Sequence, residues 1–381
     1  MVYRRKHFVL TLLVLPIFMQ SFLDMADWNI MPDLKELRKL YEKPIVDWPD
    51  PEVDEGVAWQ EWGVLPTPPL WQNKDPQIKA MIDLGKKLFF DPRLSASRQI
   101  SCSSCHDPDL HWGDGRRRAI GFDHRQGRRQ TIGLQNVWAQ KQLFWDGRVE
   151  SLDSFAKHPL EDSLEMNTPI AVALEHINDI AGYQPIIQEA FQTSKLNETQ
   201  LQQALAAFQQ TISSNITRFD NFIKGRYRAL SDQQVWGMHL FRTKARCFNC
   251  HNGPFFTDGK FHNLGFSNYG KNNQDLGRYK VTHKKEDVGA FKTAGLRDAA
   301  RTFPWFHDGR FSDLSMLLNQ YNAGMPQTKA PVSFAADTLY PKQSPLLKPL
   351  NISLEEREAI VRFLEAISAQ PITFDRPELP K

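Results

Sequence analysis

The chain has 381 residues, more than one hydrophobic core usually serves, so at least two domains are expected. Its 47 Lys and Arg residues nearly balance its 44 Asp and Glu residues, and the formal net charge of +3 argues against a protein that binds nucleic acid through its overall charge. With 41% hydrophobic residues and four cysteines, the chain is neither wholly disordered nor stapled by disulfides.

Residues 1–26 have the pattern of an export signal. Arg4, Arg5 and Lys6 precede an apolar run over residues 8–18, which is short for a membrane span of about 20 residues. No A-x-A cleavage pattern follows the run, so an uncleaved N-terminal anchor is the alternative to a cleaved signal peptide. Both interpretations predict export to the periplasm. The next segment, residues 27–75, is rich in Pro and Trp and is expected to be extended and wrapped on the body.

Beyond residue 75 the chain is predicted to be mostly helical, and the expected fold class is all-α. Asp75 followed by Pro76 is typical of a helix start, and apolar residues then recur at helical spacing over residues 77–89. Clear strand alternation is absent, and the polar stretch at residues 268–290 is expected to be a long loop. Further helices are expected at residues 201–212 and after the capping-box residues Ser231 and Ser353.

All four cysteines lie in two copies of one motif, C-x-x-C-H. The motif is typical of covalent c-type haem attachment, in which two thiols bind the haem vinyl groups and the histidine ligates the iron. Thioredoxin-like cysteine pairs need no histidine after each copy, and zinc sites bring their C-x-x-C units closer together along the chain. We therefore predict two covalently bound haem c groups, one at Cys102, Cys105 and His106 and the other at Cys247, Cys250 and His251.

An internal repeat accompanies the two motifs. Residues 131–152, TIGLQNVWAQKQLFWDGRVESL, align without a gap with residues 293–314, TAGLRDAARTFPWFHDGRFSDL. The repeat predicts two cytochrome c-like haem domains related by internal duplication and joined by long loops. The first domain is expected over residues 76–225 and the second over residues 226–381.

The repeat also distinguishes the two haem pockets by their second axial ligand. Tyr321 lies on a predicted helix after the second copy, and its counterpart after the first copy is Pro159. Because tyrosine can ligate iron and proline cannot, we predict a closed haem between His251 and Tyr321 and an open haem on His106. Met325 is the rival sixth ligand, since Met/His is the usual closed pairing in cytochromes c. An open iron site is where peroxide can bind.

The chain resembles the bacterial di-haem cytochrome c peroxidase family, which includes MauG-like members, in an ordered set of motifs: LGKKLFFDPRLS, SCSSCH, FWDGR, LFRTKARCFNCH, DLGRYKVT, GAFKTAGLRD and FHDGR. The resemblance covers residues 78–368. It implies a peroxidatic first haem and an electron-transferring second haem. It also implies oxidation by hydrogen peroxide, with electrons from a small cytochrome c or copper protein, or, in MauG-like members, oxidation of residues on a partner protein.

The resemblance implies roles for individual residues as well. Trp145 of FWDGR matches the inter-haem tryptophan of the family, and Glu165 matches its distal acid. Glu165 would shuttle the peroxide proton between the two oxygens, the alternative being a solvated helix carboxylate. Pro159 leaves the distal face of the first haem without a ligand. Tyr321 matches the sixth ligand of MauG-like members, where typical peroxidases have methionine.

The chain departs from the family pattern in several places, among them the familiar T-P-S-L motif, which is T-I-G-L at residues 131–134 and T-A-G-L in the repeat. A bridging calcium ion is implied at the carbonyl groups of Thr302 and Pro304 together with a side chain at position 130, where this chain has Gln130 instead of the usual asparagine. Phe155 stands at the usual distal glutamine position. The distal histidine of typical peroxidases is expected near Phe122, where His124 is the only nearby candidate.

Two classes of function follow from these patterns. The first is a peroxide-dependent enzyme that acts at the His106 haem, either as an electron-fed peroxidase or as a MauG-like enzyme. The second is a non-catalytic electron carrier with both haems six-coordinate, against which the proline at position 159 argues.

Overall fold

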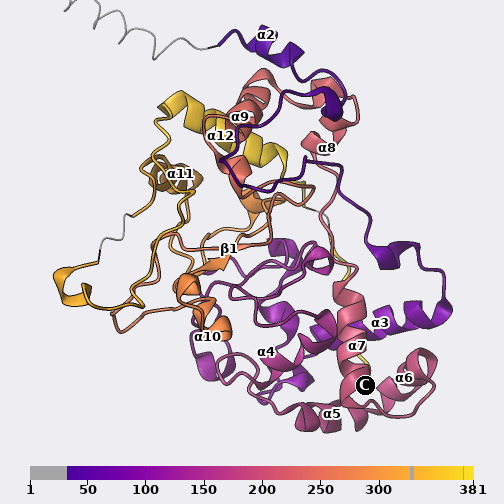
Figure 1. Cartoon of the computed structure of the whole chain (residues 1–381). Helices are drawn as coiled ribbons and strands as arrows, with labels where there is room; N and C mark the ends of the chain where they lie inside the picture. Colours follow the sequence, from indigo (N-terminus) through magenta and orange to yellow (C-terminus); the bar gives the residue numbers. More distant parts are fainter. Residues whose placement is uncertain (1–31, 327–329, 372) are drawn as a thin grey trace, which may run out of the picture.

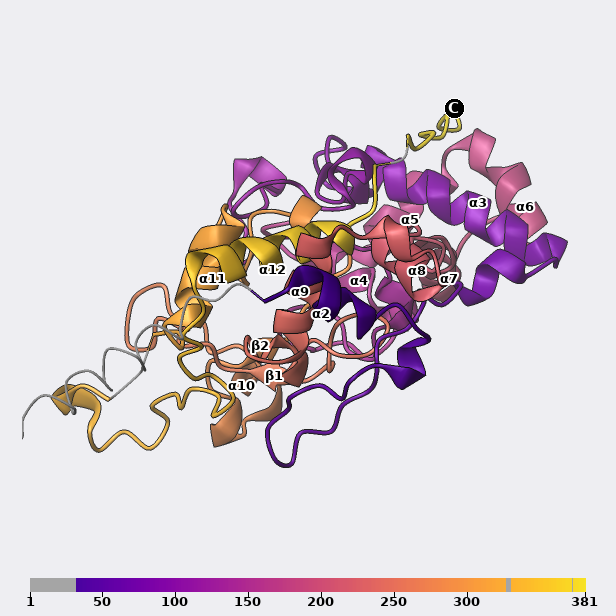
Figure 2. The same cartoon turned by 90° about the horizontal axis from the view of Figure 1, so that it is seen from above.

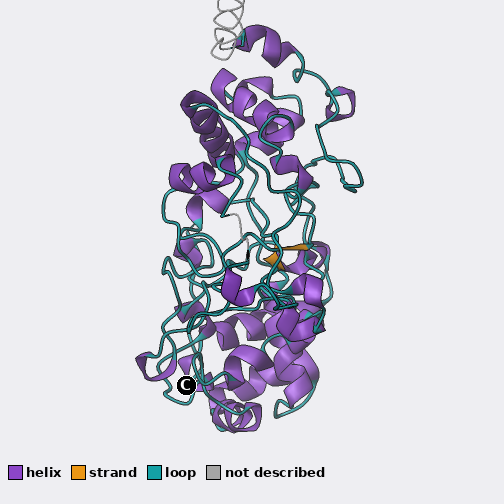
Figure 3. Ribbon diagram, turned by 60° about the vertical axis from the view of Figure 1, so that its left-hand side comes forward, coloured by secondary structure: helices purple, strands orange, loops and turns teal. Residues whose placement is uncertain are grey.

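The computed structural model of the chain describes residues 32–326, 330–371 and 373–381. The predicted signal peptide or anchor at residues 1–26 lies outside these residues. Among the described residues, no helix is both long and apolar enough to cross a membrane. Helices gather at the two ends of the described part of the chain and long loops fill its middle (Figure 3). The described residues form one two-stranded sheet, and the expected helical class is confirmed.

The described α-helices run from four residues (α10) to 15 residues (α3), and each described strand has two residues. Strand β1 pairs antiparallel with β2, with Phe261 opposite Lys292. The elements are α2 (Leu34–Lys39), α3 (Pro76–Phe90), α4 (Lys157–Glu161), α5 (Ile170–Asn178), α6 (Gln184–Phe191), α7 (Glu198–Gln209), α8 (Arg218–Ile223), α9 (Asp232–Arg242), β1 (Phe261–His262), α10 (Tyr279–Thr282), β2 (Phe291–Lys292), α11 (Leu314–Asn322) and α12 (Leu354–Ala366).

The predicted helix starts are confirmed by their capping hydrogen bonds. The Asp75 carboxylate accepts from the backbone N–H of Gln77 at 2.9 Å at the start of α3. Ser231 and Ser353 form complete capping boxes at the starts of α9 and α12. The helix expected at residues 201–212 is α7, which begins three residues earlier, after the cap residue Asn197.

Two expected loop regions contain short helices. In the Pro- and Trp-rich segment, α2 forms because the Asp33 carboxylate accepts from the N–H groups of Lys35 and Glu36, and Leu37 is buried. The expectation of a wholly extended segment is therefore wrong for residues 34–39. Likewise, α10 lies inside the loop expected at residues 268–290.

Buried hydrophobic side chains of the described residues form two clusters. Each cluster is built around one pair of packed helices, α3 with α7 and α9 with α12, which cross in Figure 1. In the first cluster α3 packs on α7, and a Cβ atom added to Gly85 would lie 1.8 Å from the carbonyl oxygen of Ala204. In the second cluster α9 packs on α12, and a Cβ atom at Gly237 would lie 1.9 Å from the carbonyl oxygen of Ala359. Glycine is thus required where each pair meets. We call the parts of the chain around these clusters the first and second modules.

The two copies of the repeat adopt matching local backbones. Short 3-10 helices occupy Val137–Ala139 in the first copy and Ala299–Arg301 in the second. Phe144 and Phe306, which the alignment pairs, both have positive φ angles, 65° and 76°. The matching geometry supports the predicted duplication, and common descent of the two modules stays a prediction.

The segments before α3 and after α12 each pack on the module that lies farther from them in the sequence. Before α3, Trp48 and Trp62 pack in the second cluster, and Phe219 and Phe222 of α8 join them. After α12, residues 373–381 return to the first module and lie beside α3 and α6 (Figures 1 and 2). Each module is therefore completed by a segment distant in sequence.

Candidate functional site

Both C-x-x-C-H motifs hold their histidine in the same way. Each motif begins with a short 3-10 helix, Cys102–Ser104 in the first and Cys247–Asn249 in the second. The Nδ1 atom of His106 lies 2.9 Å from the carbonyl oxygen of Trp112, and the Nδ1 atom of His251 lies 3.0 Å from that of Phe256. A carbonyl partner selects the tautomer with a proton on Nδ1. Nε2 then carries the lone pair that can ligate a metal.

A cavity of about 860 Å3 lies beside the second motif. The Cys247 and Cys250 side chains and the His251 imidazole line it, together with Tyr321 of α11 and several apolar side chains. The apolar lining includes Phe241, Leu296, Leu318, Ile360 and Leu364. Two thiols, an imidazole and apolar walls are the donor set and surroundings that a covalently attached haem requires, so the residues present fit that group.

The two candidate sixth ligands differ in their position relative to this cavity. Tyr321 is one of its lining residues. Burial raises the pKa of the Tyr321 phenol above its ordinary value, and the nearby Cys250 and Cys247 raise it further. Met325 is buried, with 3% of its surface exposed, and is not among the described residues that line the cavity. The geometry favours Tyr321.

The same cavity reaches the residues that were expected between the haems. Its lining includes Trp145 and the predicted calcium residues Gln130, Thr302 and Pro304. The Trp145 indole N–H donates to the carbonyl oxygen of Gln130 at 2.9 Å, and the Gln130 N–H donates to the carbonyl oxygen of His307 at 2.8 Å. The sequence prediction therefore named four residues that line the same cavity, two of which are joined by a hydrogen bond.

Lys292 is a buried cation among the residues that line this cavity, and the sequence did not predict it. Its ammonium donates to the Gln142 carbonyl oxygen at 3.0 Å and to the Gln140 side-chain oxygen, and its backbone N–H donates to the Trp145 carbonyl oxygen at 2.9 Å. Burial lowers the pKa of Lys292 to about 8. Its place in the motif GAFKTAGLRD was the available signal, but nothing local predicts that this lysine is buried.

Trp62 is a second residue that contacts the site and that the sequence did not predict. It belongs to the Pro- and Trp-rich segment, and its indole N–H donates to the carbonyl oxygen of His251 at 3.2 Å. Its ring lies 5.0 Å from that of Phe256, whose carbonyl group holds the His251 imidazole. The segment is thus part of the second site, and not merely wrapped on the surface.

On the first module, Glu165 lies beside the first motif. Burial raises the pKa of Cys102 and Cys105 to about 12, and the Glu165 carboxylate adds to the shift at both thiols. Burial, with a further contribution from Asp162, raises the pKa of Glu165 itself to about 7. A carboxyl group with this pKa can both accept and release a proton near neutral pH.

Other predicted distal residues surround Glu165 to different degrees. Phe122 donates its N–H to the carbonyl oxygen of Glu165 at 2.7 Å, whereas the nearby His124 is exposed. Phe155 packs against Phe144, with ring centroids 4.6 Å apart. Pro159 lies in α4, and its carbonyl oxygen accepts the N–H of Met166 at 3.1 Å, so the chain folds back between Pro159 and Glu165.

Two further features do not define separate sites. Asp258 and His262 form an ion pair at 2.9 Å beside Cys250, with the three ligand atoms within 4.8 Å of one another. Cys250 already belongs to the second C-x-x-C-H motif, so we assign no metal ion there.

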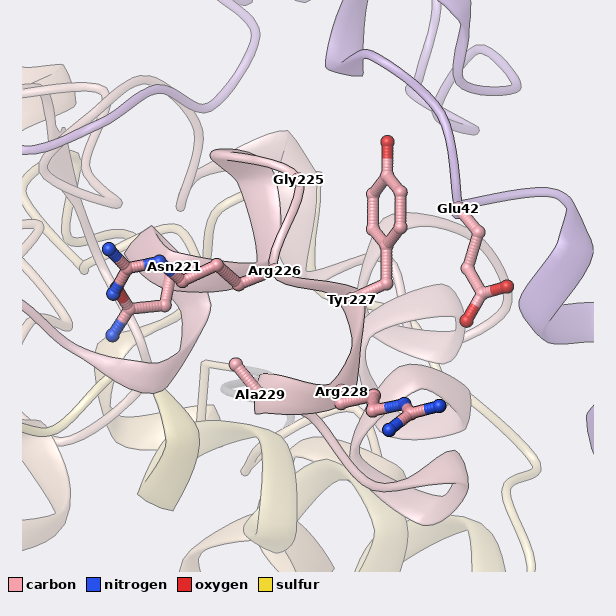
Figure 4. A pocket seen from close by; sticks show the side chains of 7 residues that line it. All are labelled: Glu42, Asn221, Gly225, Arg226, Tyr227, Arg228 and Ala229. Carbon is pink, nitrogen blue, oxygen red and sulfur yellow. The ribbon is translucent and has the colours of Figure 1, made fainter.

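A surface hollow of about 710 Å3 near α8 is lined by none of the motif residues (Figure 4). Its lining residues are Glu42, Asn221, Gly225, Arg226, Tyr227, Arg228 and Ala229.

Comparison with known proteins gives a consistent pattern. Residues 79–228 match the family model described as di-haem cytochrome c peroxidase. The chain is 35% identical over 309 residues to the methylamine utilization protein MauG of Methylorubrum extorquens, an alignment that covers 80% of this chain and 83% of that protein. It is 32% identical to the cytochrome-c peroxidase IdrP1 of a Pseudomonas species, over 83% of this chain and 89% of that protein.

Solved structures show the same fold. A MauG-like protein associated with microbial copper homeostasis superposes with a TM-score of 0.70 at 24% identity, covering 82% of this chain and 95% of that one. The diheme peroxidase BthA from Burkholderia thailandensis superposes with a TM-score of 0.67 at 22% identity, covering 84% of this chain and 93% of that one.

Proposed function

The chain belongs to the di-haem cytochrome c peroxidase family, and from this membership we infer that it is a peroxidase-type oxidoreductase with two haems, one of which reacts with hydrogen peroxide. The observation that carries the assignment of the two haems to individual sites is the contrast between Pro159 and Tyr321. The first is a residue without a ligand atom and the second is a phenol in the cavity beside His251.

We propose that both haems are attached covalently, to Cys102 and Cys105 in the first module and to Cys247 and Cys250 in the second. His106 and His251 would hold the irons from the proximal side, each oriented by the carbonyl group at its Nδ1 atom. When bound, the haem irons supply the electrons and the coordination site that peroxide cleavage needs.

Three residues of the first module would have separate roles on the side where peroxide binds. Glu165 accepts the proton of the inner peroxide oxygen on its carboxylate and delivers it to the outer oxygen, for which a pKa of about 7 is well matched. Phe155 stands where the family usually has glutamine and would contribute a ring that neither donates nor accepts a hydrogen bond. Pro159 provides no ligand atom, so the distal face stays accessible to peroxide.

Trp145 would connect the two modules, since it lines the second cavity and is held by the Gln130 carbonyl group and the Lys292 N–H. Tyr321 would be the sixth ligand of the second haem. A calcium ion would be held by Gln130, Thr302 and Pro304. These assignments are supported by the cavity that all five of these residues line.

Two kinds of partner are compatible with this chemistry. A small cytochrome c or copper protein would supply electrons, as a cytochrome-c peroxidase needs. A MauG-like enzyme would instead oxidise residues of a partner protein, and Tyr321 in the second cavity supports that alternative. We propose a periplasmic location, from the pattern of residues 1–26. A non-catalytic electron carrier is the remaining alternative.

Two measurements test the proposal. A pyridine haemochrome assay of denatured protein should find two covalent haems per chain, with a reduced count for Cys247→Ala and an unchanged count for the control Ser103→Ala, which alters a variable position of the first motif. One haem or none in the wild type contradicts the assignment.

The second measurement is peroxide reactivity. Reaction of the fully oxidised protein supports the MauG-like mode, and reaction of only the half-reduced protein supports the electron-fed mode. A protein inert in both states would contradict the peroxidase assignment and favour the electron-carrier alternative.

A further inference from the structure

Residues 373–381 contact the first module at the loop that follows the first C-x-x-C-H motif. The Phe374 ring stacks on Phe90 of α3, with ring centroids 5.6 Å apart and an interplanar angle of 12°. It also meets the Trp112 ring edge-on at 5.0 Å, and the Lys86 ammonium lies 4.6 Å from its centroid. Phe374 is therefore placed between a helix of the first module and Trp112.

Arg376 adds a polar contact to the same loop. One of its guanidinium nitrogens, Nη2, lies 2.8 Å from a carboxylate oxygen of Asp107 and 2.7 Å from one of Asp109. The end of the segment is held through its backbone, because the Pro380 carbonyl oxygen accepts from Arg93 at 2.8 Å and the Lys381 carbonyl oxygen accepts from the Gly182 N–H at 2.9 Å.

The contacted loop, residues 107–112, is the support of His106. Asp107 follows His106 directly, and its carbonyl oxygen accepts the N–H of Trp112 at 2.7 Å. The carbonyl oxygen of Trp112 in turn holds the Nδ1 atom of His106 at 2.9 Å. A displacement of Trp112 or Asp107 therefore moves the hydrogen-bond partner of the imidazole. Such partners set both the orientation and the basicity of a metal-ligating histidine.

We propose that Phe374 and Arg376 are positioning residues for the first haem, which hold the loop at residues 107–112 and through it the His106 imidazole. The segment that carries them follows α12 of the second module, so the second module supports the proximal side of the first site. This inference rests on the proposed function, in which His106 ligates the reactive haem.

The second site has a different support, which provides an internal control. There the carbonyl oxygen of Phe256 holds His251, and Trp62 packs on Phe256 and donates to the His251 carbonyl group. None of these contacts involves residues 373–381. Loss of Phe374 should therefore change the first haem and leave the second unchanged, which a general loss of folding would not do.

The experiment uses the full holoprotein with the substitutions Phe374→Ala and Arg376→Ala. Resonance Raman spectra of the reduced protein should show a shifted iron–histidine stretching band for the first haem, and electron paramagnetic resonance should show a changed high-spin signal with the low-spin signal unaltered. Phe374→Tyr, which keeps the ring, should restore both signals. Outer partners of ligating histidines typically contribute 10- to 100-fold, and Phe374 and Arg376 act on His106 only through such a partner, the Trp112 loop. Peroxide turnover should therefore fall by roughly tenfold or less.

Two control variants alter comparable residues away from the loop. Phe334→Ala removes a ring that packs on Tyr269 and Tyr340, and Arg362→Ala removes an exposed ion pair with Glu365 on α12. Both should leave the first haem unchanged. Should Phe374→Ala bind two haems with first-haem spectra identical to wild type, the inference is overturned. Should the wild type show no high-spin haem in either the oxidised or the half-reduced state, the proposed function fails instead. Arg376→Ala decides the question if Phe374→Ala does not fold.

Discussion

The indole N–H of Trp145 donates a hydrogen bond to the carbonyl oxygen of Gln130 at 2.9 Å, which joins the predicted inter-haem tryptophan to the predicted calcium site. The Gln130 backbone is also held on its other side, by the His307 carbonyl oxygen at 2.8 Å. With the backbone fixed, the length of the side chain at position 130 decides where its amide oxygen lies.

We therefore expect Gln130→Asn to tighten calcium binding, because the shorter side chain is the one that the family usually carries at this position. Calorimetric titration of calcium into chelator-treated holoprotein measures the effect. Gln135→Asn shortens another amide on the cavity wall and is the matched control. Equal affinity of the Gln130→Asn variant and the wild type would refute the proposed role of position 130.

Glu165 predicts the pH dependence of the peroxide reaction. With a pKa of about 7, the carboxylate that accepts the peroxide proton is populated above pH 7 and lost below it, so the second-order rate constant should rise with pH and level off above about 7. Glu165→Gln should lower the rate by about 10²- to 10⁴-fold and abolish this pH step. The exposed Glu175→Gln on α5 serves as the control. A pH profile that Glu165→Gln leaves intact would assign the step to another group.

Tyr321 predicts the electronic state of the second haem. A tyrosinate is an anionic oxygen donor and stabilises oxidised iron relative to a thioether, so Tyr321→Met should raise the reduction potential of that haem. Spectroelectrochemical titration measures it. Tyr321→Phe should remove the low-spin signal, whereas Met325→Leu should not. The reverse pattern would make Met325 the ligand and the protein an electron-fed peroxidase.

The close contacts at Gly85 and Gly237 predict that a larger residue at either position lowers the stability of the protein. Gly85→Ala and Gly237→Ala each place a Cβ atom less than 2 Å from a backbone carbonyl oxygen, at Ala204 and Ala359. The helices must separate, at a cost of about 1–3 kcal/mol or more, so the urea midpoint of the holoprotein should fall. Gly63→Ala is the control, since its added Cβ atom meets only Pro254 Cβ at 3.7 Å. An unchanged midpoint for both helix variants would contradict the packing described above.

Local signals account for what could be predicted from the sequence. The caps at Asp75, Ser231 and Ser353 are completed by partners two or three residues away, so a short stretch of sequence contains the whole interaction. The paired motifs and the repeat likewise indicated two similar modules. Tyr321 followed from its position relative to the second copy of the repeat, and Glu165 followed from the resemblance to the family.

Long-range contacts could not be predicted in the same way. Trp62 and Phe374 reach the two histidine loops from segments far along the chain, and no local pattern relates them to those loops. The helix at residues 34–39 was missed because the surrounding prolines and tryptophans outweighed the Asp33 cap. Lys292 stood in a recognised motif, but its burial depends on the neighbouring strand and on Gln140 and Gln142.

The central claim is that one haem is open and the other closed, and electron paramagnetic resonance of the fully oxidised protein tests it most directly. We predict one high-spin signal from the His106 haem, whose distal side has Pro159, and one low-spin signal from the haem between His251 and Tyr321. Two low-spin signals, with no high-spin component across the pH range in which the protein is folded, would contradict the account.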